Sequence, residues 1–283
     1  MAEYVGLDVS MKETAVSIRR DGKRIWRGKC ASDPRLIAEV IRRRAPGATR
    51  VVFETGPLSV CMLGRTLVAA RNRLVQITTE LSNQIRGLMK TFGLVVPAGK
   101  GSRFEAHVRA LLADQEGLAP ILLPLLEAWR AVRLRAAELG RQLVTSARRS
   151  EACQILMSVP GVGAVTATSF ATAVEDPENF RRSRSVGAWL GLTTRRYQSG
   201  EVDDDGPISR RGDTHLRGLL YEAATVILTR TSAESSLRTW GLTLKERIGF
   251  KRAAVAVARK LAVVMHAMLR SGQLFDRTAG MAA

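Results

Sequence analysis

The sequence is poor in the cysteines that small domains use for covalent or metal-based reinforcement. It has three, Cys30, Cys61 and Cys153, which are scattered and form no Cys-x-x-Cys pair. An odd, dispersed set of thiols excludes a disulfide framework and indicates no zinc site. This usage is typical of a protein in a reducing cytoplasm.

The sequence also lacks long hydrophobic runs. No apolar stretch approaches the length that spans a bilayer. The first residues, MAEYVGLDVS, lack the basic region followed by an apolar segment that marks a secretory signal. We therefore expect a soluble, cytoplasmic protein without a membrane partner.

The sequence also has few acidic residues compared with basic ones. The chain has 26 Asp and Glu against 44 Lys and Arg, which gives a net charge of +18 and a pI near 11.1. This excess predicts a polyanionic partner, nucleic acid first. Arginine clusters recur at 42–44, 148–149, 181–182, 195–196 and 210–211. Together they suit a long phosphate track, although each cluster alone reads equally well as a solvated helix face.

With 283 residues, 46% of them hydrophobic, the chain is long enough for about two folded domains. Residues 4–31 read as three short strands, and a helix follows with Asp33 as its cap and Pro34 in its first turn. A fourth strand, 50–56, ends near Glu54. This β-β-β-α-β order is the opening of an RNase H-like fold.

The middle of the chain predicts a helical hairpin. Leucines recur every seven residues at 67, 74, 81 and 88, which favours a long helix with a narrow, coiled-coil-like seam. Residues 121–149 carry a second apolar helical face. We expect the two helices to pair antiparallel, with a loop and a short helix between them.

From Glu151 onwards the sequence predicts mostly helices. An apolar Pro-Gly-x-Gly turn lies within residues 158–174, and later helices are expected near 213–229 and 251–270. The polar stretch 192–212 reads as irregular. We therefore predict an α/β domain at 1–60, a coiled-coil hairpin at 61–150 and a mostly α domain at 151–283.

Three features of the sequence are candidates for chemistry, and the first is the turn Val159-Pro160-Gly161-Val162-Gly163. It matches the helix-hairpin-helix pattern, in which backbone N–H groups bind a DNA phosphate without reading a base. The alternative is a tight turn between helices, whose glycines only permit unusual dihedral angles. The basic chain favours phosphate binding by Gly161 and Gly163.

The second feature is the pair Asp8 and Glu54, each expected at the end of a strand in one sheet. RNase H-like nucleases use such carboxylates to hold a divalent metal that activates the attacking oxygen. Two acids do not complete that site. A strand-end acid by itself is more often a turn former or a surface charge.

The third feature is the stretch Thr194-Arg195-Arg196-Tyr197-Gln198-Ser199-Gly200, which we predict to be a polar loop. A serine attacks phosphorus when a base or metal takes its proton and cations stabilise the charged transition state. The ordinary alternative for Ser-Gly is a turn without chemistry.

Motifs along nearly the whole chain resemble the DEDD transposases of bacterial insertion sequences, of the insertion-sequence 110/1111 type, which are relatives of the Piv DNA invertase. The matching stretches are YVGLDVSMKETAVSI, VVFETGPLS, NQIRGLMKTFGLVV, MSVPGVGAVTATSF, VGAWLGLTTRRYQSGEVD and ISRRGDTHLRGLLYEAA. The resemblance implies a RuvC-like N-terminal domain, a coiled-coil connection and a C-terminal transposase domain with a helix-hairpin-helix. It also implies DNA as substrate, a structured guide RNA, magnesium, a homo-oligomer and a place in the bacterial cytoplasm at the nucleoid.

The resemblance also implies roles for individual residues. The serine of the RRY-x-SG motif, Ser199 here, becomes covalently joined to DNA, and Asp8 and Glu54 correspond to the first two metal-binding acids of the tetrad. We assign phosphate contacts to the turn glycines and to the polar and basic residues around the serine, namely Gly161, Gly163, Arg195, Arg196, Tyr197, Arg210 and Arg211.

The chain departs from the family after the ETG strand. The family has a helix, a strand and an Asp-x-x-Asp helix there, whereas this chain runs from Gly56–Val60 into the long helix with no such motif, and Asp114 and Glu116 lie beyond that helix. The copy therefore reads as internally deleted, with half a metal site. We expect a DNA transposase with Ser199 as nucleophile, or a remnant that binds DNA or RNA without strand transfer. A helix-hairpin-helix repair protein is a third reading, which leaves the N-terminal strands and the RRYQSG stretch without a role.

Overall fold

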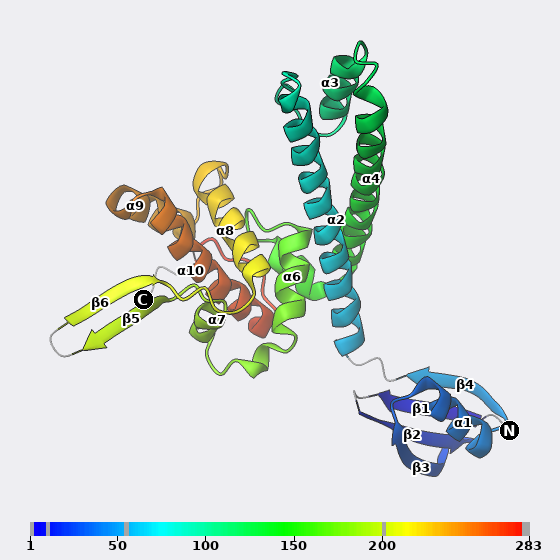
Figure 1. The fold of residues 1–283 in the computed structure, drawn as a ribbon. Helices are drawn as coiled ribbons and strands as arrows, with labels where there is room; N and C mark the ends of the chain where they lie inside the picture. Colours follow the sequence, from blue (N-terminus) through cyan, green and yellow to red (C-terminus); the bar gives the residue numbers. More distant parts are fainter. Residues whose placement is uncertain (1–2, 10–11, 54–56, 200–201, 279–283) are drawn as a thin grey trace. The chain divides into compact units, whose positions relative to one another are not determined.

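A computed structural model of the chain describes residues 3–9, 12–53, 57–199 and 202–278, and within 52–61 and 196–205 it describes the backbone alone. The chain divides into two compact units, Met1–Val60 and Cys61–Ala283. The first is a small sheet with one helix, and the second is almost entirely helical (Figure 1). Within the described residues, no helix has the length and apolar character needed to cross a membrane.

The first unit forms a four-stranded mixed sheet in the order β3-β2-β1-β4. Its elements are β1 (Glu3–Val9), β2 (Glu13–Arg20), β3 (Lys23–Ala31), α1 (Pro34–Arg44) and β4 (Ala48–Phe53). The predicted β-β-β-α-β order is thus confirmed, with β1 antiparallel to β2 and parallel to β4. Alternate residues of β1 and β2, including Val5, Leu7, Val16 and Ile18, are buried with the apolar side chains of α1. The predicted cap holds, since Asp33 Oδ1 accepts a hydrogen bond from the Arg35 amide at 2.7 Å.

The second unit begins with a helical hairpin of α2 (Pro57–Thr91) and α4 (Ala119–Arg149), with α3 (Ser102–Leu112) between them. The antiparallel pairing and the short helix are as predicted, because Ile85 and Met89 share a core with Leu122 and Leu126. The predicted leucine seam is wrong in detail. Leu67, Leu74, Leu81 and Leu88 are only partly buried, whereas Val68, Ile85 and Met89 are fully buried. Where α2 ends, α3 packs on both long helices, so the buried residues Ile85 and Met89 of α2 face two helices, α3 and α4, rather than one narrow partner.

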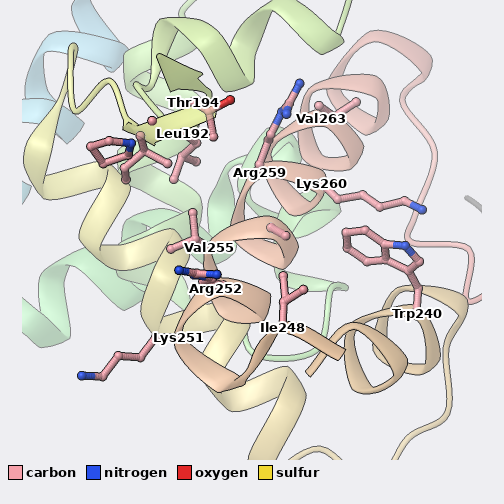
Figure 2. Close-up of a pocket in the computed structure, with 14 residues that line it drawn as sticks. Leu192, Thr194, Trp240, Ile248, Lys251, Arg252, Val255, Arg259, Lys260 and Val263 are labelled. Carbon is pink, nitrogen blue, oxygen red and sulfur yellow. The ribbon is translucent and has the colours of Figure 1, made fainter. Parts of the chain in front are cut away.

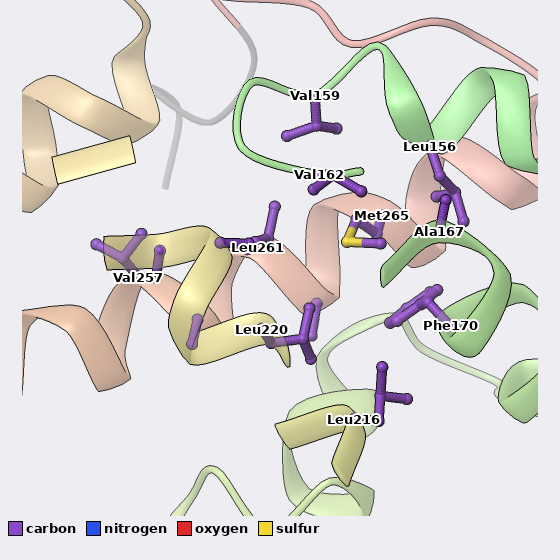
Figure 3. Close-up of a cluster of buried hydrophobic side chains, with 14 of the residues drawn as sticks. Leu156, Val159, Val162, Ala167, Phe170, Leu216, Leu220, Val257, Leu261 and Met265 are labelled. Carbon is purple, nitrogen blue, oxygen red and sulfur yellow. The ribbon is translucent and has the colours of Figure 1, made fainter. Parts of the chain in front are cut away.

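The rest of the second unit is a helical core built around α10. Its elements are α5 (Glu151–Met157), α6 (Ala164–Val174), η1 (Pro177–Asn179), α7 (Arg184–Trp189), β5 (Thr194–Ser199), β6 (Val202–Ile208), α8 (Thr214–Thr229), α9 (Ser236–Ile248) and α10 (Phe250–Ser271). Figure 3 shows Leu261 and Met265 of α10 among side chains from α5, α6 and α8. The predicted helices 213–229 and 251–270 are present as α8 and α10.

The polar stretch between α7 and α8 is not irregular, as the sequence indicated, but forms the antiparallel hairpin β5–β6. Hydropathy does not reveal this hairpin. A half-buried strand alternates apolar and polar residues, whereas these strands carry mostly polar ones and are held together by backbone hydrogen bonds. The predicted polar loop at 194–200 is therefore largely a strand, which ends at Ser199.

Candidate nucleic-acid interface

The hairpin β5–β6 places the predicted nucleophile beside a turn. Ser199 is the last residue of β5, and its backbone pairs with Val202, the first residue of β6. Further from the turn, Tyr197 pairs with Asp204 and Arg196 with Asp205. The side chains of these residues lie outside the described part of the structure. Backbone register thus puts the serine at the end of the hairpin that is furthest from the helices to which it is anchored.

The hairpin itself carries little positive charge. Two arginines, Arg195 and Arg196, lie on β5, and three aspartates occupy 203–205 on β6. A phosphate held near this hairpin therefore needs cations from neighbouring elements, since the strands alone have a small negative balance.

Two glycines fix the base of the hairpin between α7 and α8. Gly191 has φ +69°, and a Cβ there would lie 2.1 Å from the Arg211 carbonyl oxygen. Gly212 has φ +79°, and its Cβ would lie 2.1 Å from the Trp189 carbonyl oxygen. Because no side chain fits at either position, the two chain segments approach each other at backbone distance. The Arg210 amide donates to the Gly191 carbonyl at 3.1 Å, which closes the same junction.

Arg217 of α8 ties this junction together from the side. Its Nη1 donates to the carbonyl oxygens of Leu190 and Arg211, both at 3.0 Å. Charge-assisted bonds of this kind are stronger than neutral ones, so both ends of the hairpin are fastened to the first turn of α8.

The predicted phosphate-binding arginines differ in what they contact. Arg195 is exposed, and its Nη2 donates to the Ser209 carbonyl at 3.2 Å, which uses part of its guanidinium. Arg210, with φ +54°, and Arg211 are both exposed at the hairpin base. Among the described residues, neither of these two guanidinium groups has an ion-pair or hydrogen-bond partner. They are available to an anion.

A groove lies between the hairpin base, α9 and α10 (Figure 2). Its volume is about 1050 Å³. Leu192, Thr194 and Ile208 line it from the hairpin base, and Trp240 and Ile248 from α9. The α10 side contributes two basic pairs with apolar residues between and beyond them: Lys251, Arg252, Val255, Ala256, Arg259, Lys260 and Val263. Among the described residues that line the groove, none is acidic.

Pairs of residues along α10 alternate between the groove and the core. Residues 251–252, 255–256 and 259–260 line the groove, whereas 253–254, 257–258 and 261–262 are buried among the helices. The spacing follows from a period of 3.6 residues per turn, which returns every fourth residue to nearly the same face. One helix thus supplies both the centre of the fold and the cationic wall of the groove.

The predicted helix-hairpin-helix turn connects α5 to α6. Gly161 has φ +85°, and a Cβ there would lie 2.9 Å from the Ala223 carbonyl oxygen of α8. This glycine therefore has a packing role, as in the alternative reading of the turn. Gly163 instead is the N-cap residue of α6, is exposed and has no atom within 4 Å of the position a Cβ would take. Val159 and Val162 anchor the turn in the core.

In the first unit, Asp8 is exposed near the end of β1. It lines an open depression of about 420 Å³ with Arg24 and Arg27 of β3. Phe53, the last residue of β4, pairs with Leu7, the neighbour of Asp8, and Glu54 lies outside the described residues.

The described residues do not fit the magnesium that the resemblance implies. Within the part of the chain that the structure describes, no three Asp, Glu, His or Cys side chains gather closely enough to hold a metal ion. Asp8 shares its depression with two guanidinium groups, which repel a dication, and Mg²⁺ needs several oxygen ligands in an octahedron.

Sequence reasoning missed the groove. Trp240, Lys251, Arg252, Arg259 and Lys260 were not among the predicted site residues, although two basic pairs eight residues apart in KRAAVAVARK are visible in the sequence. Read with a helical period, that spacing puts four cations on one face. The contribution of α9 and the hairpin base to the same groove has no sequence signal.

Residues 153–239, from α5 into α9, match the sequence model of a family described as "Transposase IS116/IS110/IS902 family". The chain is 35% identical over 210 residues to the transposase for insertion sequence element IS1111A of Coxiella burnetii, which covers 72% of this chain and 58% of that protein. It is 31% identical over 264 residues to a putative transposase of Sinorhizobium fredii, covering 91% of this chain and 67% of the relative.

A more distant relative has a different recorded role. Over 129 residues the chain is 26% identical to the pilin gene-inverting protein of Moraxella bovis, covering 44% of this chain and 38% of that one. The chain spans about three fifths of the length of two of the transposases it matches, 58% and 61%.

Proposed function

Because the chain belongs to the IS116/IS110/IS902 transposase family, which is related to site-specific invertases, we propose that it cuts and rejoins DNA at the ends of an insertion sequence. The observation that carries the proposal is the position of Ser199 at the end of β5, on a hairpin whose base borders a groove with four cations and no acid among its described lining residues. The groove offers positive charge to a DNA strand at the hairpin base, and Ser199 lies at the other end of the same hairpin.

The proposed step is a transesterification. Ser199 Oγ attacks the phosphorus of a DNA phosphodiester and loses its proton to a base or to water. A P–Oγ bond forms, the bond to one bridging deoxyribose oxygen breaks, and that oxygen takes up a proton. One phosphodiester bond replaces another in this step, so no external energy source is needed. The hydroxyl of another DNA strand can then attack the serine ester and rejoin the DNA by the reverse reaction.

The proposal assigns phosphate binding to residues on the hairpin, at its base and in the turn between α5 and α6. Arg210 and Arg211 at the hairpin base have unpaired guanidinium groups among the described residues, which supports a role for them. We assign Arg195, Arg196 and Tyr197 to the phosphate at the serine, and Gly163 with Gly161 to a second phosphate through backbone N–H groups.

A covalent adduct tests the enzyme. The full chain is incubated with DNA that carries the junction of its element's ends, with the element's noncoding RNA, and denaturing electrophoresis is used to detect protein joined to DNA. We expect an adduct with the unmutated chain and none with Ser199→Ala, while Ser209→Ala, at the hairpin base, still forms it. An adduct that survives in Ser199→Ala, or its absence from the unmutated chain, refutes the serine mechanism.

A second candidate is a remnant that binds DNA or RNA without strand transfer. The specific observation in its favour is the poor fit of the Asp8 depression to a metal ion. This candidate predicts nucleic-acid binding that weakens steeply with salt as counterions are released, and no adduct under any condition. Binding that is insensitive to ionic strength contradicts both candidates.

The guide RNA and the homo-oligomer remain part of the proposal through the family resemblance. The element's own noncoding RNA is expected to bind more tightly than a scrambled RNA of equal length at the same salt. Sedimentation of the chain with and without that RNA measures the assembly state. Equal affinity for both RNAs contradicts a guide role.

A further inference from the structure

The groove between α9, α10 and the hairpin base combines an apolar floor with a cationic wall. Val255 and Ala256 lie on α10 between the basic pairs 251–252 and 259–260. The two basic pairs are eight residues apart, which is about 12 Å along a helix. A surface that alternates charge, apolar contact and charge over this length matches a ligand with anionic and apolar parts in alternation.

Trp240 of α9 adds an aromatic surface to the groove. Its side chain is 37% exposed, unlike the buried Trp129 of the helical hairpin. Lys260 Nζ lies 4.7 Å from the centre of the Trp240 ring, and Figure 2 shows the lysine chain extending over the indole. An aromatic ligand at this tryptophan therefore also meets an ammonium group.

The cations of the wall are mostly uncommitted. Among the described residues, Lys251, Arg252 and Arg259 form no ion pair and no hydrogen bond through their side chains. Arg259 lies with its aliphatic stem against Gly187, where a Cβ would come within 3.0 Å of Arg259 Cγ. The lack of a side chain at Gly187 thus leaves room for the Arg259 stem, and Arg259 lines the groove.

We propose that this groove binds an unpaired nucleic-acid strand, with bases on Trp240, Val255 and Ala256 and phosphates on the two basic pairs of α10. The inference rests on the nucleic-acid role in the proposed function and names the form of the ligand. In a duplex the faces of the bases are stacked on one another, so a protein surface meets phosphates and base edges, whereas an unpaired strand also offers base faces for stacking. Leu192 and Thr194 line the groove, so a strand held there lies beside the start of β5.

Fluorescence anisotropy with the full chain tests the proposal. The probes are a labelled 20-nucleotide DNA strand of mixed sequence, the same strand with abasic sites in its centre, the corresponding RNA strand, and a 20-base-pair duplex. The unmutated chain is expected to prefer the complete strand to the abasic one, because the abasic strand keeps its phosphates but has lost the bases. The RNA arm distinguishes the two sources of an unpaired strand.

Trp240→Leu reports on the bases. It is expected to bind the complete strand about 5- to 150-fold more weakly, the range for loss of one stacked base. Its affinity for the abasic strand and for the duplex is expected to stay within twofold of the unmutated chain. The preference for bases is thus lost in this variant.

The double variant Lys251→Gln with Arg252→Gln reports on the phosphates, and it keeps the test valid if Trp240→Leu does not fold. Two lost phosphate contacts are expected to flatten the slope of log K against log salt by about 1.4 for a single strand. The matched control, Lys100→Gln with Arg103→Gln, removes the same charge from two exposed residues at and just before the start of α3. It is expected to leave the slope unchanged and the base preference intact.

The outcomes separate this inference from the proposed function. If the chain binds strands but the groove variants behave like the control, the groove is not the site and only this inference fails. If a groove variant changes the self-association of the chain in sedimentation while strand binding is unaffected, the groove receives a protein surface and the inference is overturned. If the unmutated chain binds no polynucleotide, the proposed function fails as well.

Discussion

The ring of His266 on α10 donates its Nε2 proton to the backbone carbonyl of Pro177, over 3.0 Å. A carbonyl only accepts, so this nitrogen carries the proton and Nδ1 is left to accept from the Ser183 hydroxyl, also at 3.0 Å. The ring is fully buried and lies 5.3 Å from Phe180, centre to centre. One neutral histidine thus fastens the segment between α6 and α7 to the helix that lines the groove.

This arrangement predicts that stability falls in mild acid. Burial lowers the pKa of His266 below its ordinary 6.5, nearby Arg270 lowers it further, and the Pro177 carbonyl and Glu178 oppose the change. Below pH 6.5 the unfolded chain binds a proton that the folded chain does not, so the free energy of unfolding decreases as pH falls, by at most about 1.4 kcal/mol per pH unit. Urea unfolding between pH 8 and pH 5 measures it.

The control for this effect is His266→Gln, which keeps an amide donor for the Pro177 carbonyl but does not titrate. The variant is expected to be less stable at pH 8, and the gap to the unmutated chain is expected to close as the pH falls. A gap that stays constant from pH 8 to pH 5 contradicts the assignment.

Gly191→Ala is expected to loosen the hairpin base. The new Cβ would lie 2.1 Å from the Arg211 carbonyl oxygen, at φ +69°. The left-handed conformation alone costs about 1–2 kcal/mol for an alanine, and the clash adds to it. Thermal unfolding measures the loss. Gly218→Ala, inside α8 with no atom within 4 Å of its Cβ, is the matched control and is expected to gain up to about 1 kcal/mol.

Arg217→Met is expected to destabilise the same junction without introducing a clash. It removes two bonds to the carbonyl oxygens of Leu190 and Arg211 and one to Thr214 Oγ1. Because the side chain is partly exposed, we expect a loss of about 1–3 kcal/mol in urea unfolding. Arg230→Met, an exposed arginine at the end of α8, is expected to change stability by less than about 0.5 kcal/mol. Similar losses in both variants would argue against a specific role for Arg217.

Metal binding is expected to be weak. With Asp8 beside Arg24 and Arg27, titration with Mn²⁺ followed by electron paramagnetic resonance should show no saturable site below millimolar concentration. Asp8→Asn should leave the signal unchanged. A tight site that disappears in Asp8→Asn would instead mean that acids outside the described residues complete it.

The sequence predicted elements wherever a hydrophobic period was present. The strands of the first unit, α1 with its Asp33 cap, and helices α8 and α10 all have such a period. The hairpin β5–β6 has none, because its strands carry polar residues and are held by backbone pairing, so it was predicted as a loop. In α2 a hydrophobic period was present but predicted the wrong buried face, because α3 packs against that helix as well as α4.

The sequence likewise predicted only part of the candidate site. Ser199 was found through the RRY-x-SG motif, and Arg210 and Arg211 through their charge. The groove was missed because it is assembled from three separated segments, and because Trp240 and the basic pairs of α10 read individually as ordinary helix residues. The close approach of Gly191 to Arg211 also depends on the tertiary structure, so the sequence of either segment alone does not predict it.

The alternating pairs along α10 let ligand preference and folding vary independently. Positions 251–252, 255–256 and 259–260 point to the groove, while the intervening pairs supply the packed interior. A library randomised only at the groove positions should therefore yield mostly folded proteins that differ in which polymer they retain. Substitutions on this helix can therefore change which ligand binds, through natural selection or protein engineering, while the fold is kept.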